Sequence, residues 1–193
     1  MKYFLDLGGN DSCSAKIWRK MYDPKAEYKI YTFEPEPDFE QYYQTIENHV
    51  LIPSGVWIED GLMHFYQDIL DSRKAGGSMM QDKFSSNLDK EHPITISTVD
   101  FSQWLIHNFN MNDEVIVKMD IEGAEYQVIP KMFDDNTLQY IDKLMIEWHW
   151  KKLKGFQKEL HNECVKMVSS IPQQTWPGVE QAERILGKGY RNK

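Results

Sequence analysis

Apolar residues along this chain occur in short runs that alternate with amphipathic stretches and polar turns. The runs at 2–7 (KYFLDL) and 114–119 (EVIVKM) are nearly all apolar, which is typical of strands buried on both faces of a sheet. Segments such as 38–48 place their apolar residues at helical spacing instead. The pattern predicts strands at 2–7, 28–33, 50–57, 94–99, 114–119 and 143–148, and helices at 15–22, 38–48, 101–109, 122–133 and 156–171.

A hairpin and a long loop are predicted in the middle of the chain. Asp60-Gly61 is a typical hairpin turn, with 62–66 as the returning strand. Residues 68–92 are polar and rich in Gly, Ser, Lys and Asp, which predicts a mobile loop, since loops of this length are usually lids or disordered. Asp100 is placed to cap the helix at 101–109.

Strands that alternate with helices indicate a parallel sheet with right-handed crossovers. We therefore expect an α/β fold, a mostly parallel doubly wound sheet flanked by helices. The 193 residues suffice for one full core and show no linker, so a single domain over 1–193 is expected.

Composition and charge narrow the range of partners. The net charge of −8 argues against a broad basic surface, so no nucleic acid partner is expected. No apolar run approaches the ~20 residues that span a bilayer, and residues 1–10 become polar too early for a signal peptide, which predicts a cytoplasmic protein without a membrane partner. Cys13 and Cys164 lie far apart, and no metal site is predicted.

The first predicted strand runs directly into two glycines, in the sequence FLDLGGNDS. Ligands of doubly wound sheets bind beyond the carboxyl ends of the strands, where Gly8 and Gly9 permit positive φ and a close backbone approach. A simple sharp corner explains the glycines equally well. Asn10 and Cys13 depart from the dinucleotide fingerprint G-x-G-x-x-G, which makes a nicotinamide dehydrogenase less favoured.

Glu34 ends the second predicted strand, where a ribose-binding acid belongs in such folds. Its carboxylate can accept hydrogen bonds from two adjacent ribose hydroxyls, and Pro35 keeps the strand end extended. The acid and the glycine turn together favour a ligand site over a corner.

A third group of polar residues follows the predicted central strand, in VKMDIEGAE. Asp120 and Glu122 can bind a cation, orient a substrate hydroxyl or act as a base. The helix dipole explains Glu125, but it does not explain Asp120, because an acid that closes an apolar strand is costly unless it is used or paired.

Seven segments in order resemble the FkbM family of S-adenosylmethionine-dependent methyltransferases. They cover roughly residues 3–150 and read DLGGN, FEPEP, SGVWIEDGLMHFY, AGGSM, STVDFSQWL, VKMDIEGAE and IEWH. The resemblance implies a Rossmann-like class I methyltransferase fold and S-adenosylmethionine as cofactor. It also implies methylation of a hydroxyl on a sugar or another small molecule, with a small-molecule or glycan acceptor as partner.

The resemblance also assigns roles to residues. It places Asp6, Gly8, Gly9 and Asn10 at the amino-acid end of the cofactor, Glu34 at its ribose, and Gly55, Val56 and Trp57 near its adenine. Asp120, Glu122 and His149 would face the methyl group or the acceptor, with Asp120 favoured over His149 as the base. The chain has Ser12 where the family usually has a further glycine.

Two alternatives remain open. Lys118, Asp120 and Glu147 loosely resemble the acid–lysine sites of RNA 2′-O-methyltransferases, although the acidic net charge opposes this reading. A degenerate methyltransferase fold that only binds a partner is the non-enzymatic alternative.

Overall fold

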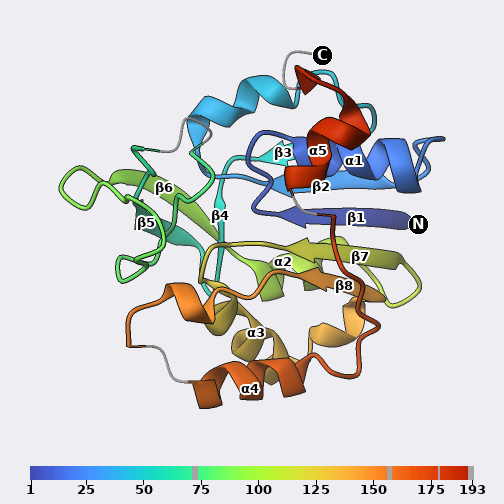
Figure 1. The fold of residues 1–193 in the computed structure, drawn as a ribbon. Coiled ribbons are helices and arrows are strands. Elements are labelled where there is room, and N and C mark those ends of the chain that lie inside the picture. The colour runs from blue at the N-terminus through green and yellow to red at the C-terminus, as the bar shows by residue number, and fades with distance from the viewer. Residues whose placement is uncertain (71–73, 156–157, 178, 191–193) are drawn as a thin grey trace.

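The computed structural model describes residues 1–70, 74–155, 158–177 and 179–190. Its centre is a sheet of five parallel strands in the order β3-β2-β1-β7-β8 (Figure 1). The strands are β1 (Lys2–Leu7), β2 (Lys29–Phe33), β3 (His49–Ile52), β7 (Glu114–Met119) and β8 (Lys143–Ile146). The parallel α/β sheet predicted from the sequence is confirmed.

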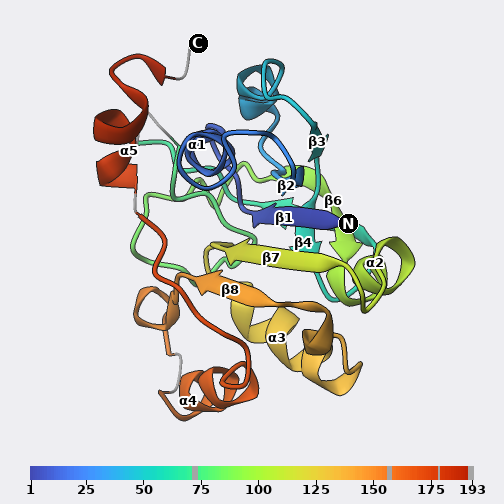
Figure 2. The same cartoon turned by 90° about the vertical axis from the view of Figure 1, so that its right-hand side faces the viewer.

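Helices cover both faces of this sheet (Figure 2). One face carries α1 (Cys13–Ile17), its π-helical continuation η1 (Trp18–Tyr22) and α5 (Val179–Leu186); the other carries α2 (Phe101–Asn108), α3 (Glu125–Asp134) and α4 (Lys158–Met167). Alternate residues of β1 pack to opposite sides, with Leu5 against the α2–α3 face and Phe4 stacked on Trp18 at a ring-centroid distance of 4.2 Å. This double burial explains the uninterrupted apolar runs.

A second, smaller sheet has the order β4-β6-β5, with β4 (Gly55–Trp57), β5 (Gly61–Phe65) and β6 (Ile94–Asp100). The single strand predicted at 50–57 is therefore wrong. Pro53 lacks an N–H, and the amide of Ser54 bonds back to the carbonyl of Ile52 at 2.8 Å, so the ladder breaks there. The predicted hairpin is also wrong, because β6 lies between β4 and β5 and pairs with both.

Several helix predictions need correction. The segment 38–48 forms only a 3-10 helix, η2 (Pro37–Tyr42). The helix predicted from 122 begins at Glu125, because Glu122 and Gly123 have φ of +54° and +112°. The last predicted helix is observed as α4 up to Met167, and residues 156–157 at its predicted start lie outside the described residues.

Other helices agree better with the prediction. The first one begins at Cys13 rather than at residue 15. Asp100 caps α2 as predicted, since its Oδ1 accepts a hydrogen bond from the Gln103 amide at 3.0 Å. Two short 3-10 helices, η3 (Leu138–Tyr140) and η4 (Trp150–Lys152), flank β8. No helix of the described segments is long and apolar enough to cross a membrane.

The predicted loop 68–92 contains no named helix or strand in its described part, but isolated bridges hold it. Tyr66 pairs with Ser78, Asp68 with Leu88, and Lys83 with Leu153. Its mobility stays a prediction, and residues 71–73 lie outside the described residues. The chain after α4 returns along β8, where the Leu144 amide donates to the carbonyl of Pro172 at 2.9 Å.

Candidate functional site

A cavity of about 690 Å³ opens at the carboxyl ends of β1, β2, β7 and β8. This is where the chain order reverses between β1 and β7, the position at which doubly wound sheets bind ligands. Eight of the eleven candidate site residues line it: Gly8, Gly9, Asn10, Glu34, Gly55, Val56, Asp120 and Glu122. The other three do not. Asp6 and His149 are fully buried behind the cavity wall, and Trp57 packs against the apolar side chains of the β4-β6-β5 sheet.

The two glycines of the first turn are required by the protein's own packing. A Cβ on Gly8, whose φ is +79°, would lie 1.9 Å from the carbonyl oxygen of Asp120. A Cβ on Gly9 would lie 2.1 Å from Cγ2 of Thr32. The glycines thus let the ends of β1, β2 and β7 meet, and the exposed side of the same turn forms cavity wall.

Glu34 joins the ends of β1 and β2. Its Oε2 accepts a hydrogen bond from the Asn10 amide at 2.7 Å, and its Oε1 accepts one from the Glu36 amide at 2.8 Å. Burial raises the pKa of Glu34 to about 7, although the two backbone N–H groups favour the carboxylate. Each oxygen keeps a further lone pair, so the carboxylate can also bind donors from the cavity.

Lys118 organises the floor of the site. Its Nζ donates to the Gly8 carbonyl at 2.8 Å and lies 3.3 Å from Asp6 Oδ1 and 3.4 Å from Asp120 Oδ2. Burial opposes its charge, but the carboxylates of Asp6 and Asp120 outweigh burial and raise the pKa of Lys118. The sequence named Lys118 only under the RNA 2′-O-methyltransferase alternative and not among the residues of the favoured function; the signal was a lysine inside the apolar run EVIVKM.

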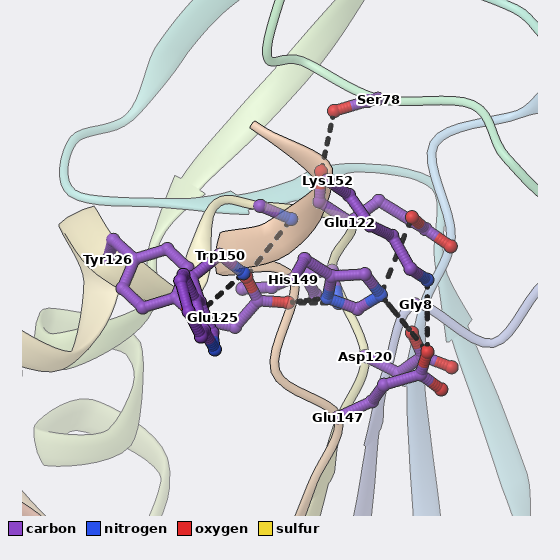
Figure 3. A network of polar contacts seen from close by, with 12 residues as sticks. Gly8, Ser78, Asp120, Glu122, Glu125, Tyr126, Glu147, His149, Trp150 and Lys152 are labelled. Carbon is purple, nitrogen blue, oxygen red and sulfur yellow. Dashed lines mark hydrogen bonds and ion pairs between the residues drawn. The ribbon is translucent and has the colours of Figure 1, made fainter. Parts of the chain in front are cut away.

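His149 lies between four carboxylates (Figure 3). Its Nδ1 is 2.7 Å from Glu125 Oε1, and both of these side chains are fully buried. Its Nε2 faces Asp120 Oδ1 at 3.5 Å, Glu122 Oε2 at 3.5 Å and Glu147 Oε1 at 3.4 Å. The fold thus brings together the three residues predicted to face the acceptor, from the ends of two neighbouring strands.

The charges of this cluster affect the role of His149. Burial by itself would lower the pKa of His149, but Glu125, Glu147 and Glu122 outweigh burial and raise it to about 10. Interaction with His149 lowers the pKa of Glu147 to about 2. In this arrangement the ring carries a proton at neutral pH and cannot accept another, so Asp120 is the better placed base.

The 74–83 segment closes the site from the side of the small sheet. Ser78 Oγ donates to the Glu122 carbonyl at 2.7 Å, and Lys83 Nζ contacts Glu122 Oε2 at 2.6 Å. Lys83 is only 1% exposed and also donates to the Gly76 carbonyl. Its contact with Glu122 could not be predicted from the sequence, because 39 residues separate the two positions and nothing local links them.

The opposite wall of the cavity is partly aromatic. Trp148 follows β8, and Trp176 lies in the returning segment after α4. Gln173 and Gln174 add polar groups beside them. The cavity thus has a polar floor at the strand ends and a mixed aromatic and amide wall.

Comparison with known proteins agrees with this architecture. Residues 6–174 match the model of the Methyltransferase FkbM domain, a segment that runs from the first strand to the returning segment at the cavity wall. Comparisons with curated proteins and with solved structures gave no significant match. The chain belongs to the FkbM methyltransferase family.

Proposed function

We propose that this protein is an S-adenosylmethionine-dependent methyltransferase that acts on a hydroxyl of a sugar or another small molecule. The observation that carries the proposal is the position of Glu34. Its buried carboxylate at the end of β2 contacts the backbone of the glycine turn after β1, on the wall of a cavity of about 690 Å³. An acid at this place suits a ribose with two adjacent hydroxyl donors.

The cofactor would lie along the strand ends. The turn Gly8–Asn10 would face its amino-acid portion, Glu34 its ribose, and Gly55 and Val56 the adenine side, all of which line one cavity. Asp6 acts from behind the wall, because it pairs with Lys118, which holds the Gly8 carbonyl. Trp57 supports the small sheet rather than the cavity.

Methyl transfer requires little covalent chemistry from the protein. The acceptor hydroxyl loses its proton to Asp120, and its oxygen attacks the methyl carbon in line with the sulfur. When bound, S-adenosylmethionine would supply the methyl group: its carbon–sulfur bond would break as the carbon–oxygen bond forms, with the electron pair left on sulfur, and the products would be a methyl ether and the neutral thioether S-adenosylhomocysteine. Positioning supplies roughly 7–11 kcal/mol of such a barrier, and proton removal contributes about 10²–10⁴-fold.

A small hydroxylated acceptor fits the walls better than a nucleic acid does. Trp148 and Trp176 contribute aromatic side chains to the lining, and Gln173 and Gln174 contribute amide groups that can hydrogen-bond to hydroxyl groups. The net charge of −8 disfavours a polyanion.

Calorimetric titration with S-adenosylmethionine and S-adenosylhomocysteine tests the cofactor assignment. Glu34→Ala should weaken binding at least about tenfold, because it removes charge-assisted hydrogen bonds worth roughly 1.5 kcal/mol or more. Glu34→Gln keeps the shape and serves as the second variant, and the exposed Glu59→Ala is the matched control. Undetectable binding to the wild type, or equal affinity in all variants, would refute the proposal.

A second assay tests the reaction itself. Release of S-adenosylhomocysteine is followed with a panel of free sugars and glycosides as acceptors. Asp120→Asn should retain cofactor binding and slow turnover by about 10²–10⁴-fold. Equal turnover in Asp120→Asn and the wild type would contradict its role as the base.

A further inference from the structure

Three side chains at the edge of the cavity converge on one point: those of Asp120, Glu122 and His149. The spacing of histidines and cysteines along the chain predicted no metal site here. Each of the three side chains offers one donor atom, and these atoms all lie within 4.8 Å of one another. Asp120 follows β7, Glu122 lies in the next turn, and His149 follows β8 (Figure 3). We propose that the three side chains bind a first-row divalent transition-metal ion.

The orientation of His149 is the independent observation that points to a ligand. The ring is fully buried, and within the described residues its Nε2 makes no hydrogen bond, although it faces the carboxylates of Asp120, Glu122 and Glu147 at 3.5, 3.5 and 3.4 Å. Its other nitrogen is fixed by Glu125, whose two oxygens also accept hydrogen bonds from the amides of Ile121 and Gly123 at 3.2 and 3.0 Å. Metal-bound histidines are typically held in this way, by a carboxylate on the nitrogen opposite the ion.

The spacing of the donor atoms suits a small divalent ion. His149 Nε2 lies 3.5 Å from Asp120 Oδ1 and 3.5 Å from Glu122 Oε2. Two ligands bound at 2.0–2.1 Å to a tetrahedral ion are about 3.3–3.4 Å apart. Small side-chain rotations therefore suffice for coordination.

The ion-pair network around these three side chains has more negative than positive formal charges, which favours binding of a cation. The network joins five carboxylates, those of Asp6, Asp120, Glu122, Glu125 and Glu147, to three lysines, Lys83, Lys118 and Lys152. The three lysines leave the five carboxylates two positive charges short. The proton on His149 supplies one of these charges in the free site, and a divalent ion that displaces this proton from Nε2 supplies both. Lys83 contacts Glu122, but a carboxylate has enough lone pairs to serve a lysine and an ion together.

The donor set favours a transition metal over magnesium or calcium. An imidazole nitrogen beside two carboxylates is a ligand set for ions such as Mn²⁺, Fe²⁺ or Zn²⁺, whereas Mg²⁺ and Ca²⁺ prefer oxygen only. Asp120 and Glu122 line the cavity while His149 lies behind them, so the open coordination positions face the cavity.

The catalytic role of the ion rests on the proposed function. An acceptor hydroxyl on the open position becomes more acidic, and its proton leaves to water before the oxygen attacks the methyl group. Asp120 then acts as a ligand instead of a base. Binding of the ion itself does not depend on S-adenosylmethionine.

The test uses Mn²⁺ as the probe with the full chain and without S-adenosylmethionine. Binding of one Mn²⁺ per chain is measured by calorimetry and by loss of the free-ion electron paramagnetic resonance signal. Asp120→Asn and Glu122→Gln preserve side-chain shape and should each weaken binding by at least about tenfold, the lower end of the effect known for residues that merely support ligands. Circular dichroism verifies that the variants fold.

Two further readouts sharpen the assignment. Coupling of Mn²⁺ to an imidazole nitrogen in the electron spin-echo spectrum should vanish in His149→Gln. His92→Ala is the matched control, because His92 forms an exposed pair with Asp89 at 3.3 Å and is 79% exposed. It should bind Mn²⁺ like the wild type.

The outcomes separate the two proposals. Absence of stoichiometric Mn²⁺ binding, or equal binding in the wild type, Asp120→Asn and Glu122→Gln, overturns the metal site. Mn²⁺ binding without S-adenosylmethionine binding supports the site and refutes the proposed function. If Mn²⁺ is bound and the proposed function holds, a chelator should abolish turnover while cofactor affinity stays unchanged.

Discussion

Replacement of Glu34 by glutamine should change how the stability of the unliganded protein depends on pH. In the folded chain burial raises the pKa of Glu34 from its ordinary value of 4.5 to about 7. The folded state therefore binds more protons than the unfolded state between these values. Since stability falls with pH wherever the folded state holds the extra proton, Glu34 destabilises the protein progressively as the pH rises from 4.5 through 7.

The magnitude follows from the two pKa values. Their difference corresponds to about 3 kcal/mol in total, of which about 2–3 kcal/mol falls between pH 5 and pH 8. Glu34→Gln removes this contribution because an amide does not titrate. The glutamine side chain also turns its NH₂ group toward the backbone N–H of either Asn10 or Glu36, which leaves that N–H without its acceptor. The resulting loss of stability, roughly 1–3 kcal/mol, is the same at both pH values.

Urea unfolding of both proteins at pH 5 and pH 8, followed by tryptophan fluorescence, measures the effect. The free energy of unfolding of Glu34→Gln relative to the wild type should increase by about 2–3 kcal/mol from pH 5 to pH 8. A relative stability that is equal at the two pH values would refute the argument that burial dominates the environment of Glu34. A decrease would mean that the backbone N–H groups outweigh burial.

Three other substitutions test the packing of the strand ends by thermal and urea unfolding. Ser12→Gly should stabilise the protein by about 1 kcal/mol, because Ser12 has φ +65° and a buried hydroxyl that makes no hydrogen bond within the described residues. A free energy of unfolding below that of the wild type would contradict this. Gly8→Ala should destabilise by about 2–4 kcal/mol, since its Cβ would meet the Asp120 carbonyl, and an unchanged melting temperature would disprove that contact. Lys118→Met should cost about 3–5 kcal/mol by leaving buried Asp6 unpaired, and the double variant with Asp6→Asn should recover part of the loss; no recovery would argue against the pair.

The fold was largely predictable from short-range patterns. The five parallel strands correspond to apolar runs, and Asp100 caps its helix as expected. The errors at 50–57 and at the start of α3 have local causes, the turn at Pro53 and the positive φ of Glu122 and Gly123, whereas the hairpin error depends on a partner distant in the chain. Nothing local in 50–66 reveals that β6, about thirty residues later, separates β4 from β5.

The candidate site was predicted through the ends of the strands. Glycine and acid positions after apolar runs pointed to Gly8, Glu34 and Asp120, all of which line the cavity. Asp6 and His149 lie buried behind the cavity wall, unlike the residues that can touch a ligand. Their burial could not be predicted from strand ends and turn residues. The contact of Lys83 with Glu122 required the 74–83 segment to fold back over the site.

The sequence by itself determined where β1, β2 and β7 end, because hydrophobic period and turn chemistry act over a few neighbouring positions. It also determined the family, through the order of its motifs. Only the tertiary structure decided which charges share a site. Asp120, Glu122 and His149 meet because β7 and β8 are adjacent and parallel, which aligns their carboxyl ends, and their pKa values depend on a burial that no local segment specifies.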